Sequence, residues 1–293
     1  MRPGAARRSP RTPLLSRRRL PAALAVAATA TATGCTDQLE PVPTDPSVEH
    51  DPLASLNRSV WTATTGEDLL ALPLEGDLSE YPAWESAGLD DASVGETRKQ
   101  LADFLHVAYL QPRVLGDLRA GTMLETIDAV TPEFWKDDLE SAWADGRHFY
   151  SYALQEGFAA VGTPHVCATW HRGQNGTVPQ LIVAGTFAHT VIDTGTRDVG
   201  VVAQRIAMRV DLGAQGEALR GIFQVTLHGI DLCATGAADG RYVPAISTAA
   251  EHETVQSRTM EQVIGSPDVA RDAMDSTSEN ALLGDEETVL LCS

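Results

Sequence analysis

The chain has 293 residues, and its 40 acidic and 22 basic side chains give a formal net charge of −18 at pH 7. Because this field repels polyanions, we expect no nucleic-acid partner and no attraction to anionic lipid headgroups. The acidic residues are spread along the chain rather than gathered in blocks. This pattern is typical of a solubilising surface, with binding of a cationic partner or of cations as the alternatives.

The first 34 residues have the composition of an export signal. They contain seven arginines and no acidic residue, and a run of about a dozen mostly apolar residues begins at Leu20. That run is too short to span a bilayer, which needs about 20 residues. A basic head, a short apolar middle and an end of small residues therefore predict export. Residues 16–20 also resemble the twin-arginine motif, and both that route and unfolded export stay open.

The leader ends at Ala32-Thr33-Gly34-Cys35, which resembles a bacterial lipobox except that Ala32 replaces the usual leucine. The arginine-rich and alanine-rich leader is similar to those of lipoproteins from high-GC Gram-positive bacteria. The resemblance implies that Cys35 is lipidated and anchors the protein in the cell membrane, on its extracytoplasmic face. Two acyl chains give stable attachment. Cleavage without lipidation and a wrongly assigned start are the alternatives.

Residues 35–52 form an acidic segment that contains four prolines. Proline fixes φ and removes a hydrogen-bond donor, and like charges repel each other. This segment is therefore expected to be an extended tether. The folded part is expected to begin near Leu53.

From about Ser93 to Gly146 the apolar residues repeat at spacings of three and four, which predicts helices. Ser93 and Glu96 have the pattern of a capping box, and Pro112 is expected to end the helix that they begin. A second helical stretch surrounds Met123 to Val130.

A third helix is predicted to have Thr131 as its cap and Pro132 at its first position, and to end at Gly146. Its large apolar residues recur at helical spacing, so they are expected to pack against the core. They are Phe134, Trp135, Leu139 and Trp143.

After about residue 164 the period of the apolar residues falls to two, which predicts strands. Val202 and Ile206 share one face of a strand in this region, whereas Arg205 and Arg209 share the other. The connections are short and join antiparallel neighbours, so a meander is expected. The four predicted strand regions are 164–172, 179–193, 198–212 and 218–232.

Helices followed by a long antiparallel sheet resemble the order of elements in the NTF2-like superfamily, over about residues 93 to 235. The resemblance implies an α+β fold, the NTF2-like cone, in which helices cover the concave face of a curved antiparallel sheet. A lipocalin-like barrel or a sandwich is the alternative. The expected organisation is an export signal at 1–34, the lipidated cysteine and tether at 35–52, an N-terminal appendage at 53–92, the NTF2-like domain at 93–240 and a C-terminal tail at 241–293.

The sequence lacks the common cofactor motifs. It has no phosphate-binding loop, no dinucleotide-binding turn, no Cys-x-x-Cys pair and no Gly-x-Ser-x-Gly elbow. His165 and His171 share one face of the first predicted strand but lie about 20 Å apart, which is too far to bind one metal ion. We therefore expect no cofactor and no metal site.

Isomerases and cyclases of the NTF2-like superfamily use a carboxylate or a histidine in the cavity, together with a tyrosine or an acid. Catalysis needs such groups within hydrogen-bond reach of one substrate, which spacing along the chain does not establish. The sequence therefore assigns no catalytic residue. The candidates are His189, Asp193, His228 and Asp231 on the strands, and Tyr109, Tyr150 and Tyr152 in or after the helices.

The sequence favours a non-catalytic lipoprotein that binds a small ligand or a protein partner through its NTF2-like domain. The alternatives are a cofactor-free cavity enzyme of the isomerase or cyclase type and a structural subunit of an envelope assembly. An acid and a base in one cavity would favour the enzyme.

Three cysteines remain besides Cys35, and export to an oxidising compartment favours one disulfide. In a sequential meander the strand of Cys167 lies roughly 14 Å from the strand that precedes Cys233, whereas a disulfide tolerates about 7 Å between Cα atoms. The expected pair is Cys233 with Cys292, which leaves Cys167 free and partly buried. Three unpaired thiols are the alternative.

Overall fold

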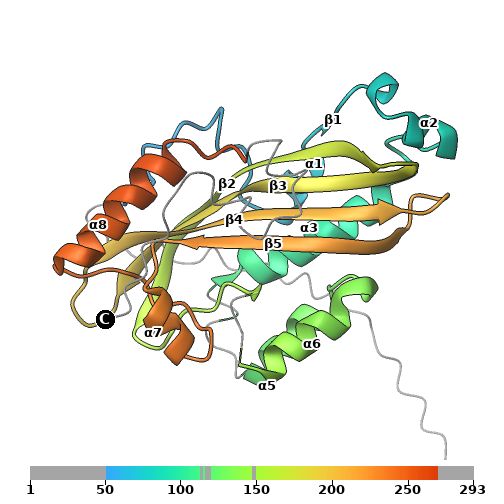
Figure 1. Ribbon diagram of the computed structural model, residues 1–293. Coiled ribbons are helices and arrows are strands. Elements are labelled where there is room, and N and C mark those ends of the chain that lie inside the picture. The colour runs from blue at the N-terminus through green and yellow to red at the C-terminus, as the bar shows by residue number, and fades with distance from the viewer. Residues whose placement is uncertain (1–50, 113–114, 116–119, 147–149, 270–293) are drawn as a thin grey trace, which may run out of the picture. The chain divides into compact units, whose positions relative to one another are not determined.

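The computed structural model describes residues 51–112, 115, 120–146 and 150–269 (Figure 1). These residues belong to one compact unit, Pro43–Ser293, and have an α+β fold. The leader, Cys35 and Cys292 lie outside the described residues. The export signal, the lipid anchor and the pairing of Cys292 therefore stay predictions.

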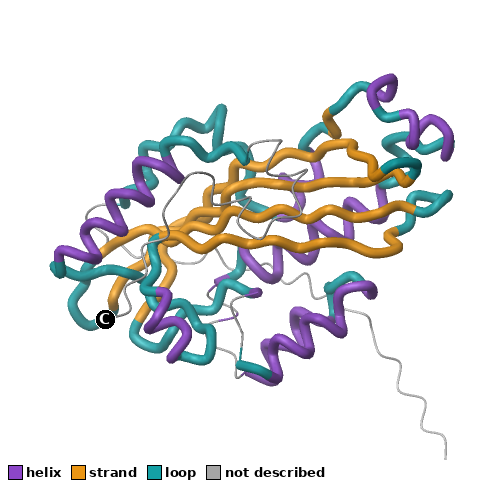
Figure 2. The backbone as a smooth tube through the Cα atoms, viewed as in Figure 1, coloured by secondary structure: helices purple, strands orange, loops and turns teal. Residues whose placement is uncertain are grey.

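The described residues form one curved, open sheet of five strands (Figures 1 and 2). The strands are β1 (Leu74–Glu75), β2 (Phe158–Asn175), β3 (Val178–Asp193), β4 (Val199–Leu212) and β5 (Ala218–His228). They lie in sequence order, with β1 parallel to β2 and all other neighbours antiparallel. The predicted meander is confirmed, but the sequence did not reveal β1, which makes the sheet mixed. An open single sheet fits neither a closed barrel nor a sandwich.

Side chains alternate between the two faces of the sheet along each long strand, as the period of two requires. On one face, here called the helix face, Phe187 of β3 lies opposite Gln204 of β4. On the other, here called the strap face, Thr186 lies opposite Arg205. The predicted separation of Arg205 from the apolar residues of β4 is confirmed.

Helices occur where the spacing of three and four predicts them, before the long strands (Figure 1). The described helices in this region are α3 (Gly95–Tyr109), α5 (Ala120–Asp128) and α6 (Lys136–Ala144), with the 3-10 turn η2 (Glu133–Trp135) before α6. The other described helices lie before or after this region: α1 (Gly66–Ala71), η1 (Leu78–Glu80), α2 (Pro82–Ala87), α7 (Leu232–Ala237), α8 (Ala250–Arg258) and the π-helical turn η4 (Thr259–Ile264).

Two predicted helix caps are wrong. The first turn of α3 has no side-chain cap, because Ser93 bonds to the carboxylate of Asp90 in the preceding turn. The hydroxyl of Thr131 donates to the carbonyl of Ile127, 2.8 Å away, so it closes the end of α5. The predicted end of α6 is confirmed, since Gly146 follows it with a φ of +72°.

Side chains on the helix face of the sheet form one hydrophobic cluster with side chains of α3, α5 and α6. The ring of Phe223 on β5 lies 4.7 Å from that of Trp135, centroid to centroid. Trp135, Leu139 and Trp143 are buried as predicted, and Phe134 is partly buried. The ring of Trp135 therefore packs on the edge strand β5.

The strap face is covered in part by residues 259–269, here called the strap. The guanidinium of Arg205 donates to the carbonyls of Gln262 and Ser266, both 2.9 Å away. The hydroxyl of Thr186 donates to the carbonyl of Pro267. These bonds hold the strap across β3 and β4.

Residues 53–92 also pack against the sheet. The strand β1 extends the sheet beside β2, and the indole N–H of Trp84 donates to the carbonyl of Gly173, 2.8 Å away. The indole N–H of Trp170 on β2 donates to the carbonyl of Leu69, 2.7 Å away. This segment is thus part of the core.

None of the described helices is long and apolar enough to cross a membrane.

Candidate functional site

The end of α3 and the segment after α6 bring two of the predicted tyrosines to β3. Tyr109 is the last residue of α3, and the backbone N–H of Tyr152 donates to the carbonyl of Ala108, 2.6 Å away. The ring of Tyr152 stacks on that of His189, with centroids 4.1 Å apart. His189 also hydrogen-bonds to the backbone of Tyr109. Three predicted candidates therefore meet at one place.

A fourth polar residue, Gln204 on β4, lies on the same face of the sheet. Gln204 is opposite Phe187, and His189 is opposite Val202, so Gln204 and His189 are diagonal neighbours on the helix face. We call Tyr109, Tyr152, His189 and Gln204 the interior polar cluster.

The interior polar cluster is sealed from solvent and only partly paired. Tyr109, Tyr152 and Gln204 have no exposed surface, and His189 is 2% exposed. Five polar atoms have no hydrogen-bond partner in the part of the chain that the structure describes: the two phenol oxygens, His189 Nε2 and both terminal atoms of Gln204. Each such group lowers stability by about 1–3 kcal/mol, so stability does not account for the cluster.

Burial also keeps the cluster uncharged. It lowers the pKa of His189 to about 3, and the hydrogen bond to the Tyr109 backbone offsets only part of this effect. It raises the pKa of Tyr109 and Tyr152 well above the usual value, and the nearby Tyr242 adds to the effect. Proton transfer from such a phenol to such an imidazole is unfavourable. The cluster is therefore suited to hydrogen bonding rather than to acid–base catalysis.

Aromatic rings surround the cluster. The ring of Tyr109 lies 6.3 Å from that of Phe187 and 6.1 Å from that of Phe223, in tilted arrangements. The ring of Tyr152 meets that of Tyr242 edge to face at 5.3 Å. The surroundings of the cluster are therefore largely aromatic, and its unpartnered polar atoms are hydrogen-bonding groups among these rings.

The other predicted candidates have separate places. Asp193 accepts backbone N–H groups in the turn after β3, and Asp231 caps the N-terminus of α7. His228 lies on the strap face opposite Ala203. Tyr150 packs edge to face on Trp135. The carboxylates of Asp193 and Asp231 do not reach the interior polar cluster. The predicted candidates therefore do not form an acid–base pair.

The two histidines of β2 do not converge either. His165 is buried, and its pKa is lowered by burial and by the charge of Arg58. His171 bonds to the hydroxyl of Thr169, 2.8 Å away. Among the described residues no group of three or more histidine, cysteine or acidic side chains is placed to hold a metal ion.

The described residues include two cysteines, Cys167 and Cys233, which differ in their bonding. Cys167 is free, as predicted, and it is buried rather than partly buried. Cys233 is disulfide-bonded, and its pairing with Cys292 stays a prediction because that residue lies outside the described chain.

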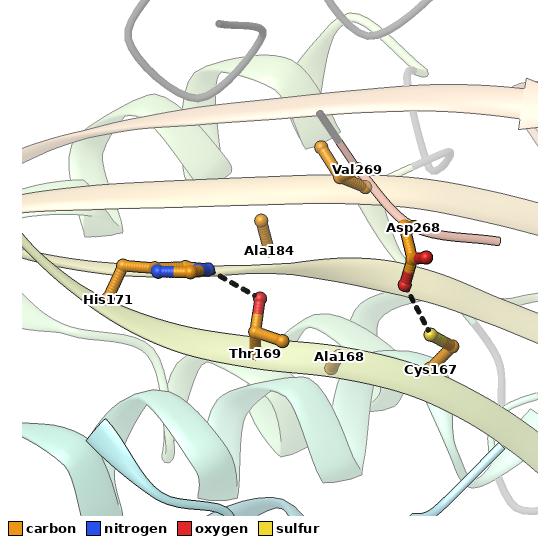
Figure 3. A pocket seen from close by; sticks show the side chains of 7 residues that line it. All are labelled: Cys167, Ala168, Thr169, His171, Ala184, Asp268 and Val269. Carbon is orange, nitrogen blue, oxygen red and sulfur yellow. Dashed lines mark hydrogen bonds between the residues drawn. The ribbon is translucent and has the colours of Figure 1, made fainter. Parts of the chain in front are cut away.

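A small pocket lies on the strap face, beside the end of the strap (Figure 3). Its volume is about 220 Å³, below the range of about 300–1,000 Å³ for typical ligand pockets. The thiol of Cys167 donates to Asp268, 3.3 Å away, and burial raises its pKa to about 12. Such a thiol is not a nucleophile at neutral pH. This pocket is therefore the weaker candidate.

Sequence reasoning identified His189, Tyr109 and Tyr152 but missed Gln204. The signal was present, because Gln204 shares the period-two face of Val202 and Ile206. A polar residue at an inward position of a strand is unusual and points to a special environment.

Comparisons of the chain with protein-family models, with curated proteins and with solved structures give no match. The described architecture is an α+β domain in which helices cover one face of a curved, open sheet. The interior polar cluster lies between the sheet and the end of α3.

Proposed function

We propose that the protein is a lipid-anchored lipoprotein on the extracytoplasmic face of the cell membrane, and that its NTF2-like domain binds a small molecule at the interior polar cluster without catalysis. The leader and the lipobox-like residues before Cys35 support the anchor. The order of helices and strands supports the NTF2-like fold.

Five unpartnered polar atoms in an aromatic core carry the proposed binding function. Protein cores contain few such atoms, and proteins keep locally unfavourable residues mainly where function uses them. A ligand that bonds to these atoms removes their cost and gains affinity from doing so. The lowered pKa of His189 and the raised pKa of the two phenols favour binding over catalysis.

Access to the cluster requires motion, since its side chains are at most 2% exposed. A ligand reaches them only when a covering segment opens, so association and release are both slow. Slow release favours retention of the ligand through purification.

Native mass spectrometry of the exported full-length protein tests the binding function. Wild type should carry a small molecule, whereas Gln204→Leu should not. The matched control is Gln215→Leu, a change of the same kind at an exposed turn, which should keep the ligand. A ligand-free wild type, or an equally loaded Gln204→Leu, contradicts the proposal.

The anchor is tested by changing Cys35→Ala. Without the thiol that carries the diacylglyceryl group, the protein should appear in the medium or remain as an unprocessed precursor. Cell fractionation and gel mobility measure this. Partitioning and mobility equal to those of the wild type would show that Cys35 does not hold the anchor.

A further inference from the structure

The interior polar cluster offers both donors and acceptors. The bond between His189 and the Tyr109 backbone raises the pKa of the imidazole, so the ring donates to a carbonyl oxygen there. The unpartnered atom is Nε2, which makes Nδ1 the donor and leaves Nε2 as an acceptor. The amide of Gln204 adds one acceptor oxygen and one donor nitrogen, and each phenol adds a donor.

The same site offers no charge to a ligand. Burial lowers the pKa of the imidazole and raises that of the two phenols, so these groups are neutral at neutral pH, as the amide is. Hydrophobic residues of the main core pack around them. A carboxylate or an ammonium placed there would lose its water without gaining a counter-charge, which is strongly unfavourable.

The aromatic surroundings favour an aromatic body. The rings of Phe187 and Phe223 lie within about 6 Å of Tyr109, tilted against it. Tilted and edge-to-face contacts are the arrangements that aromatic rings prefer with one another. An aromatic ring can therefore replace or join these contacts while its polar group faces the cluster.

We propose that the ligand is an uncharged aromatic molecule whose polar group both donates and accepts hydrogen bonds, as a carboxamide does. This inference rests on the proposed binding function and narrows it to one chemical class. A carboxamide supplies the donor that His189 Nε2 and Gln204 Oε1 need, and the acceptor that Gln204 Nε2 and the phenols need.

Four probes of similar size test the class: benzamide, benzoate, benzylammonium and toluene. Each is titrated into the full-length protein at pH 7, and the dissociation constant is measured by NMR. Benzamide should bind at least about tenfold more tightly than each of the other three, because it alone pairs the buried atoms without burying a charge. In Gln204→Leu the advantage of benzamide over toluene should fall to less than about threefold, whereas Gln215→Leu should keep it.

The outcomes separate this inference from the function on which it rests. Binding of benzoate or benzylammonium as tight as that of benzamide overturns the uncharged class. So does benzamide binding that Gln204→Leu leaves unchanged, and so does the absence of binding by all four probes. The binding function itself fails only if the wild type carries no co-purified molecule, or if Gln204→Leu carries the same one.

Discussion

Substitution of Gln204 by leucine should abolish ligand binding and yet stabilise the ligand-free protein. The amide of Gln204 is buried without a hydrogen-bond partner, so replacing it by leucine removes an uncompensated polar group. We expect Gln204→Leu to raise the free energy of unfolding of the ligand-free protein by about 1–3 kcal/mol. Urea denaturation measures this change.

Gln180 provides the matched control. It is also buried, but its amide donates to the carboxylate of Asp211, 2.6 Å away. Gln180→Leu leaves that carboxylate without this donor and should lower the free energy of unfolding by about 1–3 kcal/mol. Equal destabilisation by both substitutions would mean that Gln204 is paired in solution.

The buried histidines should make the protein sensitive to mild acid. Burial lowers the pKa of His189 and His228 to about 3, so between pH 6.5 and 3 the unfolded chain binds protons that the folded chain does not. The free energy of unfolding should therefore fall as the pH falls, by about 2 kcal/mol for each of these histidines between pH 7 and pH 5. In His189→Gln the fall should be smaller by that amount. An identical fall in the variant would mean that His189 is protonated in the fold.

Cys167 should be inert in the folded protein. Burial, reinforced by the hydrogen bond to Asp268, raises its pKa to about 12, so only about one thiol in ten thousand is ionised at pH 8. Iodoacetamide should label it at least about a hundredfold more slowly in buffer than in urea, as read by peptide mapping. Similar rates in the two conditions would place the thiol in solvent.

At the scale of elements, we expect α6 to stabilise the fold through the buried ring of Trp143. Trp143 is 7% exposed and lies in the main hydrophobic cluster. Trp143→Ala should lower the free energy of unfolding by roughly 3–5 kcal/mol, because the lost ring leaves a cavity. Glu140→Ala on the exposed side of the same helix should change it by less than about 0.5 kcal/mol. A comparable small change for Trp143→Ala would contradict the packing.

Long periodic elements were predictable from sequence. Very short elements, and caps whose side chains have an alternative hydrogen-bond partner, were not. The period of two located β2 to β5, and the turn glycine after α6 was correctly identified. The strand β1 has two residues, too few to show any period. The predicted cap at Ser93 was wrong because the hydroxyl of Ser93 donates to the carboxylate of Asp90. A Ser-x-x-Glu pattern does not distinguish this local hydrogen bond from a helix cap.

At the scale of the whole molecule, sequence order predicted the α+β class and the meander, since short connections leave few topologies. It predicted neither the packing of residues 53–92 nor the path of the strap. Both depend on contacts between residues far apart in the chain, such as Trp84 with Gly173 and Arg205 with Gln262. The interior polar cluster has the same origin: its members come from α3, a loop, β3 and β4, and only folding brings them together.

The side-chain amide of Gln204 offers the most direct measurement of whether the cluster binds an uncharged aromatic amide. In full-length protein labelled with ¹⁵N at glutamine side chains, the Gln204 signal is identified by its loss in Gln204→Leu. Adding benzamide should shift this signal and leave that of Gln180, which lies on the strap face, in place. A Gln204 signal that does not move, or one that moves no more than that of Gln180, would contradict binding of an uncharged aromatic amide at the interior polar cluster.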